Sequence, residues 1–143
     1  MKYGFLGVKV IECFFKDNGM APPKDGKLEI KPSISRNIRL AESGENINRL
    51  ILTLKIASTE AEPKPFELTV ALLGVFAAED IKPEEERKFV IEATNVLFPY
   101  FRAQVSAFTA SVGVPPLNLP VVSGPLFPED RDGFAFTTDG NIN

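Results

Sequence analysis

Residues 66–113 read FELTVALLGVFAAEDIKPEEERKFVIEATNVLFPYFRAQVSAFTASVG, and the spacing of the apolar residues changes within this stretch. Before residue 79 they alternate, which predicts a strand, with Gly74 at a bend or bulge. From residue 83 they recur every three or four residues, which predicts a helix. Pro83 and the glutamates after it are typical of a helix start, because carboxylates favour the positive end of the helix dipole. Gly113 ends the predicted helix, and Pro99 predicts a bend within it.

Three segments before this stretch also have the pattern of strands. Residues 5–15 are apolar on both faces, and we expect both faces to be covered. Residues 27–40 and 49–58 alternate between apolar and polar residues, which is typical of strands with one wet face. Pro32 lacks a backbone N–H and predicts an edge or a break in its strand. The sequence therefore predicts an α+β fold, with a four-stranded antiparallel sheet and one long bent helix packed on one face.

The composition argues against catalysis. The chain has 143 residues, enough for one domain, and histidine is absent, which excludes histidine bases, triads and ligands. The lone cysteine, Cys13, lies in an apolar strand, so we expect a buried and inert thiol and no internal disulfide. The residues 84–86 are all glutamates, but they point to different sides of a helix and are explained by the helix dipole. We expect no enzyme activity, no metal and no cofactor.

The net charge and the first residues of the chain limit the kinds of partner and the cellular compartment that we expect. The formal net charge of −3 argues against a nucleic-acid surface. No run approaches the roughly 20 apolar residues of a membrane span, and the first residues lack the pattern of a secretory signal. We therefore expect a cytoplasmic protein that is not inserted in a membrane.

Residues 111–128, SVGVPPLNLPVVSGPLFP, form a predicted loop that is unusually apolar. A solvated loop is normally polar, so these leucines and valines need a partner. The loop either folds down and caps the core, or it forms the wall of an apolar groove, and the sequence pattern does not separate the two. The apolar strand at residues 5–15 suits either a groove or an interface between copies of the chain.

The helix and this loop together resemble the SecB family of protein-export chaperones. The resemblance is carried by Asn95-Val-Leu-Phe-Pro-Tyr-Phe-Arg102, then by Pro115-Pro-Leu-Asn-Leu-Pro120 and Leu126-Phe127. Each motif alone is weak, whereas the three in this order are specific. The strand at 66–76, which ends in Gly-Val-Phe, also looks like the last strand of that family.

The resemblance implies a function and an assembly. SecB proteins are ATP-independent holdases that bind unfolded or nascent polypeptides in long apolar grooves during export. They form homotetramers, as dimers of dimers with the long helices between two extended sheets. Some members serve toxin–antitoxin systems, so a dedicated chaperone or adaptor with one partner is the alternative.

The resemblance also implies site residues, by position in the family's motifs. The client-binding groove would contain Phe66, Leu68, Phe76, Leu117, Leu119 and Phe127. The oligomer interface, made by the long helix and the first strand, would contain Val8, Val10, Phe98, Tyr100, Phe101 and Arg102. Docking of the translocase motor SecA would involve Glu67 and Thr69.

The C-terminal end departs from the family pattern. Pro128 and a short polar tail follow Leu126-Phe127, where the family usually has a second helix, so we expect that helix to be short or absent. The family's motor-binding tail is not recognisable, which leaves client holding better supported than SecA docking. We expect one SecB-like domain at residues 1–128 and an acidic, partly disordered tail at 129–143.

Overall fold

The computed structural model describes residues 2–20, 32–42, 44–114, 119 and 126–131, and the backbone of residues 140–142. The elements in chain order are β1 (Tyr3–Asp17), β2 (Ser33–Arg39), β3 (Ile47–Ile56), β4 (Phe66–Ala78), the 3-10 turn η1 (Pro83–Glu85), α1 (Glu86–Ser111), the 3-10 turn η2 (Pro128–Asp130) and β5 (Gly140–Ile142). The predicted α+β fold is confirmed, with four long antiparallel strands and one long helix. The first part of the strand predicted at 27–40 lies outside the described residues.

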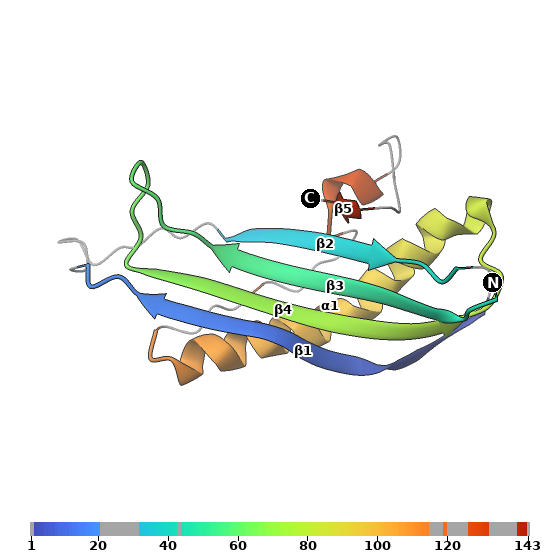
Figure 1. Ribbon diagram of the computed structural model, residues 1–143, viewed down its shortest axis with the longest axis horizontal. Coiled ribbons are helices and arrows are strands. Elements are labelled where there is room, and N and C mark those ends of the chain that lie inside the picture. Colours follow the sequence, from blue (N-terminus) through green and yellow to red (C-terminus); the bar gives the residue numbers. More distant parts are fainter. Residues whose placement is uncertain are drawn as a thin grey trace.

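The strands form one antiparallel sheet in the order β1-β4-β3-β2-β5. Strand β1 is therefore one edge of the sheet, and among the described residues it pairs only with β4. Strand β5 lies beside β2 at the opposite edge (Figure 1) and was not predicted. Helix α1 crosses behind the sheet diagonally, from the β2 side at its start to the β1 side at its end (Figure 1).

The core lies between one face of the sheet and α1. Every second residue of β3 and β4 is buried there, as the alternation predicts. The helix contributes residues at three- and four-residue spacing and is continuous through Pro99, which lies on its exposed side. The residues that are less than 2% exposed include Leu52, Leu54, Leu68, Val70, Phe76, Val90, Leu97, Phe101 and Val105.

Gly74 does not mark a bend or bulge. It pairs in regular register with Val8 on one side and Leu50 on the other. A Cβ added at this position would lie 3.0 Å from Cδ1 of Leu97 and 3.1 Å from a ring carbon of Phe76. The glycine is therefore explained by the close approach of α1 to β4, a tertiary contact that the strand pattern does not contain.

The irregular positions lie in β1. The register shifts between Phe5 and Gly7, and again between Val10 and Glu12. Each extra residue reverses the alternation of side chains. Val10 pairs with a residue of β4 whose side chain faces the helix, and so does Cys13, although strict alternation would put them on opposite faces.

The contact at Gly74 gives a test of the packing between helix and sheet. We expect Gly74→Ala to lower the free energy of unfolding by about 1–3 kcal/mol, because the methyl group overpacks a filled core. Urea denaturation at one fixed protein concentration measures the change, since assembly also contributes to stability. The control is Gly4→Ala, where no atom lies within 4 Å of the added Cβ. Equal stabilities for the two variants would contradict this account.

Candidate functional site

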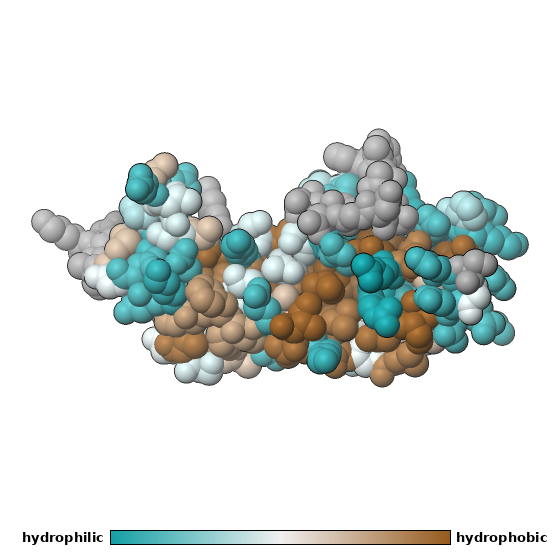
Figure 2. All heavy atoms as spheres, viewed as in Figure 1, coloured by the Kyte–Doolittle hydropathy of each residue, from teal (hydrophilic) through white to brown (hydrophobic). Residues whose placement is uncertain are grey.

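The edge strand β1 carries a strip of exposed apolar side chains. Leu6 is 58% exposed, and Tyr100 of α1, beside this strand, is 50% exposed. The other members of the strip are Val8, Val10, Ile11 and Phe14. Hydrophobic residues gather along the margin that β1 and β4 form (Figure 2). Both faces of β1 therefore expose apolar side chains, because α1 reaches only part of this strand. From the sequence we expected both faces to be covered.

The outer backbone edge of β1 has no strand partner among the described residues. The strand is 15 residues long, and such an edge presents a row of N–H and C=O groups that can pair with another chain. Exposed apolar side chains beside an open edge are typical of an association surface.

The residues predicted for an oligomer interface fall into two groups. Val8, Val10 and Tyr100 are exposed, and Arg102 is half-buried, so these are accessible to a partner. Phe98 and Phe101 are buried, and their rings lie 6.5 Å apart, centre to centre. These two phenylalanines hold α1 on the sheet within one chain.

The residues predicted for a client groove lie mostly inside the core. Phe66, Leu68, Phe76 and Phe127 are at most 6% exposed. Leu119 is half-buried and packs against the core, and Leu117 lies outside the described residues. The predicted motor-docking pair, Glu67 and Thr69, shares the outer face of β4, and both residues are half-buried.

Cys13 is exposed, so the prediction of a buried thiol is wrong. The second bulge of β1 turns it toward the helix side of the sheet, where α1 does not fully cover the strand. The amide Nε2 of Gln104 lies 3.8 Å from its Sγ.

The structure contains a buried ion pair that the sequence analysis missed. Arg36 of β2 is fully buried, and its guanidinium donates to both carboxylate oxygens of Asp130, at 2.6 and 2.8 Å. Nη1 also donates to Oγ1 of Thr94 in α1, at 2.9 Å. The ring of Phe127 lies 4.5 Å from the guanidinium carbon. A two-pronged hydrogen bond and an aromatic face suit the planar guanidinium group.

The ion pair fixes the segment 126–131 against β2 and α1. Arg87 of α1 adds a hydrogen bond to the backbone oxygen of Asp130, at 3.2 Å. The expected tail from residue 129 therefore begins within the folded body, because Asp130 is buried. The signal in the sequence was a charged residue, Arg36, on the apolar face between Ile34 and Ile38.

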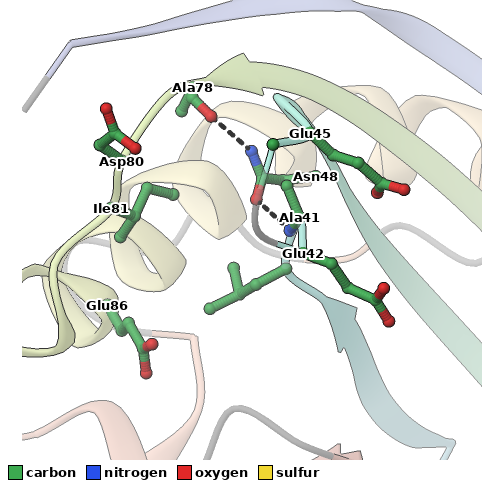
Figure 3. A pocket seen from close by; sticks show the side chains of 10 residues that line it. Ala41, Glu42, Glu45, Asn48, Ala78, Asp80, Ile81 and Glu86 are labelled. Atoms are coloured by element: carbon green, nitrogen blue, oxygen red, sulfur yellow. Dashed lines mark hydrogen bonds between the residues drawn. The ribbon is translucent and has the colours of Figure 1, made fainter.

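A small cavity lies near the end of β4, and the side chain of Asn48 in its wall links two segments of backbone. Asn48 accepts a hydrogen bond from the backbone N–H of Ala41 at 2.8 Å and donates to the carbonyl of Ala78 at 3.4 Å (Figure 3). In the part of the chain that the structure describes, no three His, Cys, Asp or Glu side chains are grouped to hold a metal ion. The cavity, of about 220 Å³, is lined by four carboxylates, those of Glu42, Glu45, Asp80 and Glu86.

Two shifted pKa values lie near the start of α1, and both have structural causes. Burial raises the pKa of the Tyr3 hydroxyl, and the nearby carboxylate of Glu92 adds to the effect. A hydrogen bond from the backbone N–H of Lys82 lowers the pKa of Glu85. Tyr3 packs edge-on against Phe89, with ring centres 5.4 Å apart. The contacts of Tyr3 fasten the start of the helix to β1, whereas the Lys82–Glu85 hydrogen bond is local to the turn before the helix.

The fold and the exposed edge define a class of small α+β proteins with a long helix on an antiparallel sheet and an open apolar margin. The family model described as "Preprotein translocase subunit SecB" matches residues 7–127. The chain belongs to the SecB family, which confirms the resemblance found in the sequence.

Known relatives agree with this assignment. The chain is 31% identical over 119 residues to the protein-export protein SecB of Azoarcus sp., covering 78% of this chain and 79% of that protein. It is 30% identical over 127 residues to the uncharacterized protein MJ0357 of Methanocaldococcus jannaschii, covering 86% and 79%. The SecB-like chaperone Rv1957 of Mycobacterium tuberculosis, solved with a ChAD peptide from the Rv1956 HigA1 antitoxin, shares the fold. Its TM-score is 0.67 at 18% identity, over 87% of this chain and 93% of that one.

Among the described residues, no helix is long and apolar enough to cross a bilayer.

The buried ion pair is testable by removing one partner or both. We expect Asp130→Ala to lower the free energy of unfolding by about 3–5 kcal/mol, because it leaves the charge of Arg36 buried and uncompensated. The double variant R36M/D130L should lose much less, since apolar side chains of similar volume can replace such a pair. Denaturant titration measures both variants.

The control for the ion pair is Arg39→Met, which removes an exposed arginine from the same strand. Its stability should match that of the parent. If the double variant lost as much as Asp130→Ala, the cost would come from packing, and the role assigned to the charge pair would be wrong.

Proposed function

We propose that this protein is an ATP-independent holdase, a chaperone that binds unfolded or nascent polypeptides. The observation that carries the proposal is that the chain belongs to the SecB family, and it is supported by exposed apolar surface suited to association with other polypeptides, whether a client or a second copy. We include in the proposal a cytoplasmic location, no enzyme activity, no cofactor and no nucleic-acid partner.

The chemistry of these surfaces suits clients of many sequences. Burial of apolar area contributes about 25 cal/mol per Å², whichever side chain supplies it. Strand edges add main-chain hydrogen bonds, which also do not depend on the client's sequence. Because the chaperone binds only the unfolded form, it delays folding by mass action and needs no nucleotide.

We propose that the client groove is bordered by Leu119, with Leu117 in the same loop. Leu119 is half-buried and therefore accessible to a client without rearrangement. Phe66, Leu68, Phe76 and Phe127 are buried, so they contact a client only after the groups that cover them move. In this proposal these four buried residues pack beneath the groove and hold its accessible residues in place.

We propose a homotetramer, as a dimer of dimers, in which the exposed part of the predicted interface is covered. Val8 and Val10 pair with residues of β4 that face the helix, but both side chains remain exposed because α1 covers only part of β1. Tyr100 lies close by, with its ring 5.4 Å from that of Phe5. Together with Arg102 they offer a partner both a sheet edge and a helix surface. Several grooves in one assembly would raise avidity for a long client.

Docking of SecA is a further part of the proposal. Glu67 and Thr69 lie on the outer face of β4, away from the helix, where a large partner could reach them. Lys16 pairs opposite Glu67, so the carboxylate has a cation across the strand.

A dedicated chaperone with one partner is the second candidate. The SecB-like chaperone of M. tuberculosis, which shares the fold, was solved with a peptide from an antitoxin. A member with one partner would ignore unrelated unfolded chains, whereas a general holdase would bind them. Binding of an unrelated client therefore separates the two candidates.

The holdase proposal is tested with a permanently unfolded, unrelated client, such as reduced and carboxymethylated α-lactalbumin. We expect native mass spectrometry to show an assembly that gains the client's mass without nucleotide. Leu119→Ser should weaken client binding about tenfold, since it removes accessible apolar area worth about 1.4 kcal/mol.

The matched control for the client test is Leu40→Ser. Leu40 is also half-buried at the edge of the core, but it lines the cavity beside Glu42. It should lower stability without changing client affinity. Equal losses of affinity in the two variants would contradict the assigned groove, and an assembly that ignores the client would favour the dedicated chaperone.

The assembly is tested by placing charges on the exposed strip. We expect the double variant V8R/V10R to shift the mass from a tetramer to a smaller species, because buried like charges repel. Native mass spectrometry and size-exclusion chromatography measure the shift. Lys9→Arg keeps the charge on the opposite face of the same strand and should leave the tetramer intact. A tetramer in both variants would place the interface elsewhere.

A further inference from the structure

We propose that the outer edge of β2 is a strand-addition site for an extended client segment, and that β5 occupies it when no client is bound. This inference rests on the proposed holdase function and names the site at which a client's backbone pairs. Its occupant is an extended polypeptide in antiparallel orientation, recognised through its main chain.

The pairing of β5 shows which geometry this edge accepts. Gly140–Ile142 lies antiparallel to β2, with Ile142 opposite Arg36 and Gly140 opposite Ile38. The segment lies at the end of the sheet order, beside β2 (Figure 1). An added strand of this kind gains main-chain hydrogen bonds from any sequence except proline.

The edge is longer than its occupant. Strand β2 has seven residues, and β5 pairs with three of them. The residues at 33–35 and at 39 pair with β3 on their inner side but lie beyond the three pairs that β5 makes. A client strand that follows the whole of β2 makes more hydrogen bonds than β5 does, so it can displace β5.

The edge stays in place when β5 leaves. Strand β2 pairs with β3 over its whole length, and Ile38 is buried in the core. The ion pair between Arg36 and Asp130 holds the preceding C-terminal segment independently of β5. Release of β5 therefore exposes a rigid template and leaves segment 126–131 docked, so a client strand binds without having to order the sheet first.

The edge of the sheet formed by β1 is assigned to a second copy of the chain. In the proposed tetramer, β1 and its apolar strip are covered by a second copy, which leaves the edge of β2 as the free end of the sheet. Among the side chains of β2 that do not face the core, Ser33, Asn37 and Arg39 are exposed and polar. A polar edge of this kind is suited to reversible pairing through the backbone and resists permanent association.

The test releases β5 and measures client affinity. Two variants do so: a chain that ends at residue 139, and the double variant N141P/I142P. Because neighbouring N–H groups of a strand point to opposite sides, one of the two removed N–H groups faces β2. Fluorescence anisotropy with labelled, reduced and carboxymethylated α-lactalbumin gives the Kd. We expect a three- to tenfold lower Kd in both variants, because the apparent Kd varies inversely with the fraction of molecules whose edge is free. The variant N141A/I142A keeps both N–H groups and should bind as the parent does.

Hydrogen exchange of residues 36–38 provides the second readout. In the variant that ends at residue 139, exchange should speed up at those amides of this segment that face β5 rather than β3, and it should slow again when the client binds. Slow exchange restored by the client, together with the lower Kd, supports the proposal. Client binding that leaves these amides unprotected overturns it, because the client then pairs elsewhere.

The remaining outcomes separate this inference from the proposed function. A parent chain that binds the client while both variants bind equally or more weakly overturns the strand-addition site and leaves the holdase function standing. A chain that binds no client, with or without β5, overturns both. Larger assemblies on release of β5, without tighter client binding, would show that the edge pairs with a second copy and would overturn the client assignment.

Discussion

The structure depends on one constraint, which is that a single helix must cover a wide sheet. Helix α1 has 26 residues and is therefore about 39 Å long, but it is only about 10 Å across. Five strands at about 4.8 Å spacing make a sheet roughly twice as wide. A helix that crosses such a sheet diagonally covers a band of the core and leaves opposite corners open.

The two corners of the sheet that α1 leaves open, on the β2 side and on the β1 side, differ in what packs on them. On the β2 side, the segment 126–131 returns and covers the core, with Phe127 over Arg36. On the β1 side, no described segment of the chain covers Val8 and Val10. The asymmetry leaves apolar area exposed on the β1 side only, which is where the proposed tetramer places its interface.

The buried ion pair fixes position more than it adds stability. A buried pair of charges is often no more stable than apolar side chains of the same volume, but either charge alone is costly. Arg36 therefore accepts only an arrangement that brings Asp130 to it, and this selects one docking site for the C-terminal segment. The same segment precedes β5 in the chain, so the ion pair fixes the point beside β2 from which the last residues continue.

Much of the fold was predictable because each element has a local signal, and 66–78 and the helix after Pro83 are the clearest cases. The candidate site was less predictable. Residues such as Phe66 and Phe101 fit an apolar groove or interface by sequence, yet they lie in the core of one chain. A phenylalanine has the same chemistry in either place, and only its neighbours in space decide between them.

The sequence by itself determined the strands, the helix, the absence of histidine chemistry and, through its motifs, the SecB family. These properties are local, since they follow from the spacing of apolar residues and the identity of single residues. The tertiary structure decided the rest: which edge of the sheet stays open, why position 74 is glycine, and that Arg36 meets Asp130 from 94 residues away. Such features depend on contacts between distant segments, and the pattern of one segment carries no information about its partner.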